Sequence, residues 1–114
     1  MSESACMIEV NGKKVCLYPS EKIIKLLGKE YTILIVGLLG NREKSSFNEI
    51  AKSVGNPSPN LLSHRLHEME EAGLILRDVV NTRPVSVKYS LTKRGRELRG
   101  LLIPVFKWLE TVQR

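Results

Sequence analysis

The segment from Ser58 to Ile75 constrains the fold most, because it carries the start, the periodicity and the end of one helix. Ser58 is a preferred N-cap residue, and Pro59 fits the first helical position, where its missing N–H costs nothing. Gly73 stands where helices commonly end in a left-handed residue. Apolar residues recur at steps of four and three, which predicts one buried face; they are Leu62, Leu66, Met69 and Ala72. The segment therefore predicts an amphipathic helix over residues 59–72.

The opposite face of this helix is polar and basic. It carries Asn60, Ser63, His64, Arg65 and His67. A helix that buries one side and offers donors and positive charge on the other suits the major groove of DNA. With Ser58 at the N-terminal end, these residues are our candidates for contact with bases and phosphates. The alternative is a solvated surface with no ligand.

A second short helix is predicted directly before this one. Ser46-Phe47-Asn48-Glu49 has the spacing of a capping box and opens a helix that reaches about Val54. Gly55-Asn56-Pro57 supplies the turn into the next helix, so residues 46–72 have the spacing of a helix-turn-helix. Lys44 and Ser46 are candidate phosphate contacts, because a helix N-terminus attracts anions.

Two short β-rich runs follow, at residues 74–80 and 85–91, and the turn Asn81-Thr82-Arg83-Pro84 joins them. Together they predict a hairpin over residues 74–91. Arg83 at its tip and Lys88 on its second strand are candidate DNA contacts. The alternative for Arg83 is that its charge only keeps an edge strand soluble.

Thr92 is expected to cap a final helix over residues 92–113. An apolar stripe at steps of four and three runs along it; its residues are Leu98, Leu102, Val105, Leu109 and Val112, with Leu101 and Trp108 widening it. Since earlier residues already supply a core, the stripe predicts contact with a second copy, and packing on its own domain is the alternative. Pro104 predicts a kink or break near Ile103.

Four basic residues open this final helix: Lys93, Arg94, Arg96 and Arg99. Cations there oppose the helix dipole, so local helix stability does not explain them. They are either contacts to the DNA backbone, Arg94 foremost, or a solvated face.

Residues 6–17 predict a β-hairpin, because Asn11-Gly12 is a strong two-residue turn signal. The register places Ile8 opposite Val15 and Met7 opposite Cys16. Cys6 and Cys16 then point to opposite faces, which disfavours a bridge between them. A helix over residues 21–27, capped by Ser20, and an apolar helix over residues 29–39 complete the expected core.

The composition restricts the classes of function. The chain has 114 residues, which predicts one domain over 1–114, and its net charge of +6 favours a polyanionic partner. No apolar run reaches the roughly 18 residues that cross a bilayer, and no signal peptide is apparent, so a cytoplasmic location without membrane contact is expected. His64 and His67 lack the cysteines or acids of a metal site, and no catalytic grouping stands out. Neither a cofactor nor enzymatic activity is predicted.

Several motifs in this order resemble those of HxlR-type transcriptional regulators, relatives of the MarR-like group. They are Leu27-Gly28-Lys29-Glu30-Tyr31, Phe47-Asn48-Glu49-Ile50, the segment 58–75, and Val87-Lys88-Tyr89-Ser90-Leu91-Thr92 followed by Gly95 and Trp108. The resemblance implies an α+β, mostly α, winged helix-turn-helix with an N-terminal β-hairpin extension and a C-terminal dimerisation helix. It also implies a homodimer that binds a near-palindromic operator in double-stranded DNA and regulates transcription.

Cys16 is a candidate thiol sensor through this resemblance alone. The family often has a cysteine followed by proline ahead of the first helix, whereas Leu17 follows Cys16 here. Reactive thiols need nearby cations or a helix N-terminus, and Lys13 and Lys14 are close in sequence. The alternative is a buried or idle cysteine.

Two other functions remain open for a winged helix of this kind. It could be a protein-interaction module within a larger assembly, or a small component of an enzyme complex. DNA binding that weakens steeply as the salt concentration rises would favour the regulator.

Overall fold

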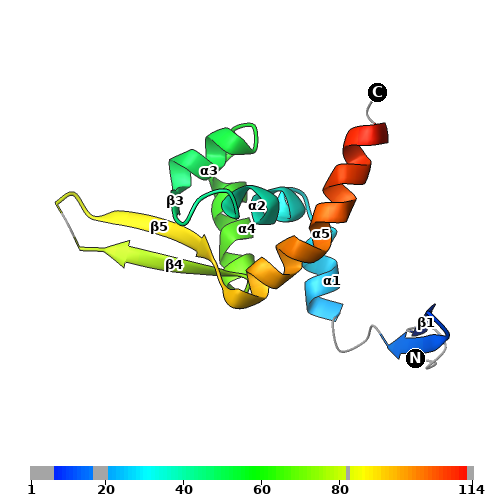
Figure 1. Ribbon diagram of the computed structural model, residues 1–114. Coiled ribbons are helices and arrows are strands. Elements are labelled where there is room, and N and C mark those ends of the chain that lie inside the picture. Colours follow the sequence, from blue (N-terminus) through cyan, green and yellow to red (C-terminus); the bar gives the residue numbers. More distant parts are fainter. Residues whose placement is uncertain (1–6, 17–20, 82, 113–114) are drawn as a thin grey trace.

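The computed structural model describes residues 7–16, 21–81 and 83–112 and has a winged-helix architecture (Figure 1). The helices are α1 (Glu21–Leu27), α2 (Thr32–Leu39), α3 (Phe47–Ser53), α4 (Pro59–Glu71) and α5 (Lys93–Val112). The strands are β1 (Met7–Val10), β2 (Lys13–Cys16), β3 (Ser45–Ser46), β4 (Ile75–Val80) and β5 (Ser86–Leu91). β1 and β2 form one antiparallel sheet, and β3, β5 and β4 form a second one in that order. The predicted winged helix-turn-helix is confirmed.

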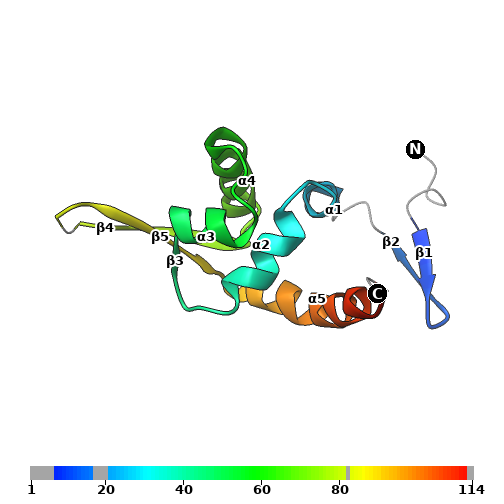
Figure 2. The ribbon, with the colours of Figure 1, turned by 90° about the horizontal axis from the view of Figure 1, so that it is seen from above.

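Helix α2 occupies the middle of the body, with α4 and α5 on opposite sides of it (Figure 2). Ile35 and Val36 of α2 are completely buried, as are Leu62 and Met69 of α4. This apolar contact is the main source of stability for the helical body, because burying each such side chain contributes about 1.5–3 kcal/mol. The helix predicted over residues 29–39 starts later than expected, at Thr32, because Tyr31 before it has a left-handed φ of 74°.

The end of α4 is fastened to the start of α5. The Thr92 hydroxyl donates to the Gly73 carbonyl at 2.6 Å and accepts from the Gly95 N–H at 3.0 Å, so Thr92 is the predicted cap. The two segments approach so closely here that a Cβ on Gly95 would lie 2.1 Å from the Leu74 carbonyl oxygen. The residue at position 95 must therefore lack a side chain.

Helix α5 also crosses the C-terminal end of α2, in a contact that we call the α2–α5 joint. Arg99 Nε donates to the Gly37 carbonyl and its Nη2 to Asn41 Oδ1, both at 2.9 Å. The Arg99 side chain passes directly over Gly40, where a Cβ would lie only 1.9 Å from Nε. The Phe106 ring packs on Gly37 in the same way, at 3.0 Å from a Cβ built there. Two glycines thus let α5 approach α2 closely.

A kink or break is predicted near Ile103, and the structure shows no break, because α5 is continuous from Lys93 to Val112 with Pro104 inside it. The ribbon instead changes direction along its length (Figure 1). A proline removes one backbone hydrogen bond and crowds the carbonyl four residues earlier, which bends a helix where neighbouring turns and packing hold it together.

The N-terminal hairpin has the predicted register, with Ile8 opposite Val15 and Met7 opposite Cys16. Asn11 and Gly12 have φ values of 51° and 78°, the positive pair that a type I′ turn requires. All eight strand residues are exposed, and the hairpin stands apart from the body in both views (Figures 1 and 2). The interpretation of Cys16 as buried is therefore wrong, while the predictions for Cys6 and Ser20 lie outside the described residues.

In the part of the chain that the structure describes, no helix combines the length and the apolar character that crossing a bilayer requires.

Two glycines of α5 give a matched test of the close approach. Gly95→Ala should lower the free energy of unfolding by about 2 kcal/mol or more, because the new methyl group meets the Leu74 backbone and forces it to move. Gly100→Ala, where nothing lies within 4 Å, should raise it by up to about 1 kcal/mol through helix propensity. Urea unfolding measures both, and equal effects of the two substitutions would contradict the packing described.

Candidate nucleic-acid interface

Helix α4 presents a polar face to solvent, while its N-terminus is capped and its opposite side is buried. The Ser58 hydroxyl accepts from the Leu61 N–H at 3.2 Å, and Pro59 occupies the first turn, as predicted. Leu66 and Met69 lie at most 1% exposed on the underside. The exposed residues of the opposite face are Asn60, Ser63, His64 and His67.

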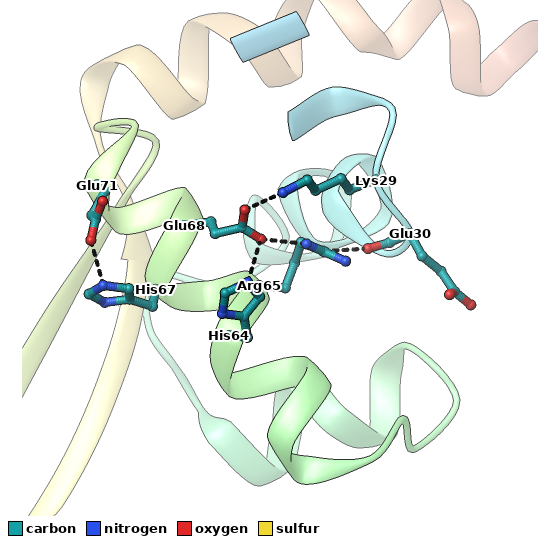
Figure 3. A network of polar contacts seen from close by, with 7 residues as sticks. All are labelled: Lys29, Glu30, His64, Arg65, His67, Glu68 and Glu71. Atoms are coloured by element: carbon teal, nitrogen blue, oxygen red, sulfur yellow. Dashed lines mark hydrogen bonds and ion pairs between the residues drawn. The ribbon is translucent and has the colours of Figure 1, made fainter. Parts of the chain in front are cut away.

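Arg65 does not belong to this exposed face, and its prediction as a DNA contact is wrong. Its side chain is only 8% exposed and so is buried, unlike those of its neighbours on the polar face. Its Nε donates to the Glu30 carbonyl at 2.8 Å, and its Nη1 binds the Glu68 carboxylate (Figure 3). Position 65 follows Leu62 by three residues and precedes Met69 by four, so it lies along the edge of the buried stripe.

The carboxylate of Glu68 joins α4 to the segment that precedes α2. Lys29 and Arg65 both bind it, and His64 Nε2 lies 3.6 Å from its Oε1 (Figure 3). The hydrogen bond from Lys29, followed by that from Arg65, holds the pKa of Glu68 below its ordinary value. This cluster holds α4 against the segment that precedes α2. The spacing of three and four from Arg65 and His64 could have indicated Glu68, whereas no sequence signal indicated Lys29.

His67 pairs in the same way with a glutamate of its own helix. Its Nε2 lies 2.5 Å from Glu71 Oε1, and both side chains are about two-thirds exposed. The two histidines of the polar face therefore each have a carboxylate one turn later.

Ser46, predicted as a phosphate contact, caps the N-terminus of α3 together with Glu49. The Ser46 hydroxyl accepts from the Glu49 N–H at 3.1 Å, and Glu49 Oε1 accepts from the Ser46 N–H at 2.9 Å. Hydrogen bonding to the carboxylate from the Ser46 backbone N–H, followed by that from the Ser46 side chain, lowers the pKa of Glu49, and the charges of Arg42 and Lys88 add to this. The carboxylate thus takes the place expected for a phosphate.

The remaining predicted DNA contacts are basic residues on or beside the hairpin of β4 and β5, which we call the wing. Lys44 pairs with Asp78 at 3.1 Å, with both side chains about half exposed, and Lys88 lies 3.9 Å from Glu49. Arg83 is exposed near the tip of the wing, which projects away from the helices (Figure 1). Arg94 is exposed as well, but its Nη1 donates to the Ala72 carbonyl at 3.2 Å and closes the end of α4.

The apolar stripe of α5 divides into two parts. Leu98 and Leu102, predicted as dimer contacts, are partly buried and pack against the core of their own domain. The second part stays uncovered and includes Leu101, at 74% exposed, and Trp108, at 61%. Val105, Leu109 and Val112 continue it and are between 37% and 52% exposed. Among the described residues, no three histidine, cysteine or acidic side chains come together in a way that could hold a metal ion.

The Glu68 cluster should make stability depend on pH. Because its pKa is lowered in the folded protein, Glu68 stabilises the fold above its ordinary pKa of 4.5 and loses that contribution as the pH falls through the folded value. Glu68→Gln should therefore lower the free energy of unfolding at pH 7, and the difference from wild type should shrink steadily below pH 4.5.

Urea unfolding across this pH range measures the effect. The control is Glu71→Gln, which removes an exposed carboxylate from the same helix and should change the free energy of unfolding by less than about 0.5 kcal/mol. A Glu68→Gln deficit that is the same at every pH would show that the carboxylate charge does not hold α4.

Comparison with known proteins identifies the family. Residues 26–114 match the HxlR-like helix-turn-helix family. The HTH-type transcriptional regulator YvaP of Bacillus subtilis is 40% identical over 88 residues, which span 77% of this chain and 81% of that protein.

Solved structures agree with this assignment. A possible HxlR family transcriptional factor from Thermoplasma volcanium GSS1 superposes with a TM-score of 0.84 at 32% identity, over 95% of this chain and 96% of that one. The reduced form of the transcriptional regulator YodB from B. subtilis has a TM-score of 0.70 at 30% identity, over 82% and 91% of the two chains. The chain therefore belongs to the HxlR-like helix-turn-helix family and is a transcriptional regulator with a winged-helix fold.

Proposed function

We propose that this regulator binds a specific sequence of double-stranded DNA as a homodimer. The observation that supports this most directly is the polar face of α4, where Asn60, Ser63, His64 and His67 point to solvent while the opposite side of the helix is buried. Such a helix can lie in the major groove and bring its N-terminal side chains to the base edges.

The wing and the net charge supply the contacts that do not depend on sequence. Arg83 extends the basic surface beyond the helices, and the chain carries a net charge of +6. Lys44 and Lys88 have carboxylate partners, but both are at least one-third exposed and can exchange those partners for phosphates. Neutralising phosphates releases counterions, so affinity should fall steeply as salt rises.

Selection of bound fragments from a random duplex pool tests this function. The wild type should recover one near-palindromic sequence. Asn60→Ala should relax the preference at one position of each half-site, at a cost of about 1–3 kcal/mol, because asparagine pairs with adenine in the major groove. Arg83→Gln is the matched comparison, and it should weaken all sequences equally and reduce the salt slope by about 1.

Either of two results would contradict the proposal. Recovery of no sequence above the random pool would favour a protein-interaction module within a larger assembly. An unchanged preference in Asn60→Ala would exclude this residue from base recognition.

The second half of α5 is the proposed dimer surface. Leu101, Val105, Trp108, Leu109 and Val112 form an exposed apolar stripe at the end of the chain opposite to the wing (Figure 1). Water contact with such a stripe is unfavourable, and a second copy can cover it with its own α5. A two-fold dimer of this kind presents two α4 helices to two half-sites, which accounts for a near-palindromic operator.

A charge in this stripe should separate the dimer. Leu109→Glu should give a monomer in sedimentation velocity at concentrations where the wild type is dimeric, because the carboxylate would be buried without a partner. Lys107→Glu is the matched control, since it changes the charge of a neighbouring exposed residue outside the stripe and should leave the dimer intact. An intact dimer in Leu109→Glu would refute this interface.

A further inference from the structure

A hollow of about 440 Å³ lies at the α2–α5 joint. This size falls within the range of small-molecule sites, roughly 300–1,000 Å³. The apolar part of its lining is formed by Leu39, Leu91 and Ile103. The positively charged part is formed by Arg42, Arg96 and Arg99. Glu43 is the one carboxylate among the lining residues, so the hollow carries an excess of positive charge.

The hydrogen bonds of the three arginines to other described residues do not use all of their N–H donors. Arg96 Nη1 donates to the Leu91 carbonyl at 3.1 Å, and Arg99 binds the Gly37 carbonyl and the Asn41 amide oxygen. These acceptors are neutral, whereas Arg42 binds the carboxylate of Glu49. A guanidinium has five N–H donors, so each side chain can bind a further oxygen. The contacts described for Arg96 and Arg99 leave their positive charge without a carboxylate.

The hollow is lined from the α5 side of α2, whereas α4 lies on the other side of α2 (Figure 2). The charge of Arg99 complements the dipole at the end of α2, but the acceptor of Arg96 is the Leu91 carbonyl at the end of a strand, where no helix dipole calls for a cation. A cationic rim beside an apolar lining is instead the arrangement that recognises an amphipathic anion.

We propose that the hollow binds a small organic anion, with a carboxylate or phosphate group between Arg96 and Arg99 and an apolar body on Leu39, Leu91 and Ile103. Charge-assisted hydrogen bonds to guanidinium groups hold the anionic end. The apolar body gains from leaving water, which separates such a ligand from inorganic phosphate.

Binding at this place would act on the proposed dimer. Arg99 fastens α5 to the end of α2, and the second half of α5 carries the proposed dimer surface. A ligand that binds one arrangement of this joint better than another shifts the population toward that arrangement, and with it the spacing of the two α4 helices. This regulatory part rests on the proposed function, whereas the binding site does not.

Binding is tested first, by isothermal titration calorimetry of the full chain in the absence of DNA. The probes are 3-phenylpropionate and phenyl phosphate, with neutral 3-phenylpropan-1-ol and inorganic phosphate as matched controls. At least one of the two aromatic anions should bind with a dissociation constant of about 1 mM or tighter, and both controls should bind at least about tenfold more weakly. The stronger of the two anions identifies the preferred anionic group.

Two substitutions test whether the anion binds at the proposed site. Arg96→Gln should weaken the bound anion about tenfold or more, whereas Lys22→Gln, which removes one charge from exposed α1, should leave its affinity unchanged. Absence of binding by both aromatic anions, equal binding of the alcohol, or equal loss in the two variants would overturn the site.

The regulatory part is measured separately, on the duplex recovered by selection. The bound anion should change the affinity of the wild type for this duplex, and Arg96→Gln should abolish that change, measured as the ratio of DNA affinities with and without anion for each variant. Binding of the anion with no effect on DNA affinity would overturn regulation and leave the site in place. Failure to recover any duplex would refute the proposed function alone, because calorimetry does not depend on DNA.

Discussion

Packing on α2 positions every surface that we assign a role. On one side, its buried Ile35 and Val36 share the core with the underside of α4, so the polar face of α4 can point only outward. On another side, Gly37 and Gly40 leave space for Phe106 and Arg99 of α5. A helix of only eight residues can do this because it is apolar nearly all round, which is typical of a helix enclosed by others. A change in the packing of α2 would move the polar face of α4 and the proposed dimer helix together.

The parts of this structure that could be predicted are those with local causes. The Ser58 cap, the Ser46–Glu49 capping box, the Asn11-Gly12 turn and the Thr92 cap each depend on residues within a few positions of one another, and the structure contains all four. The role of Arg65 was predicted wrongly for the opposite reason. Its partner carbonyl, on Glu30, is 35 positions away in the sequence, so no helical pattern could show whether the guanidinium turns inward. The sequence of a helix does not distinguish a basic side chain that faces solvent from one that a distant segment of the chain buries.

The partners of the basic residues at the start of α5 also could not be predicted from the local sequence. They oppose the dipole of their own helix, which made a ligand or solvent the only explanations available from sequence. In the folded protein Arg94 donates to the Ala72 carbonyl at the end of α4, and Arg99 donates to the Gly37 carbonyl in the last turn of α2, 62 positions away. Cations stabilise a helix at its C-terminus, so these side chains complement the dipoles of two other helices rather than their own.

This arrangement also determines how α5 can transmit a signal. Its first half is part of the core through Leu98 and Leu102, and its second half is exposed and apolar. The helix is continuous across Pro104, so a rotation where Arg99 crosses Gly40 is carried to the exposed stripe rather than absorbed at a break. A dimer built on that stripe would convert a small change at the joint into a larger change in the distance between recognition helices, because these lie on the far side of α2. The cationic hollow is lined by the end of α2 and by α5, so a ligand bound there would contact both helices at the crossing where such a change begins.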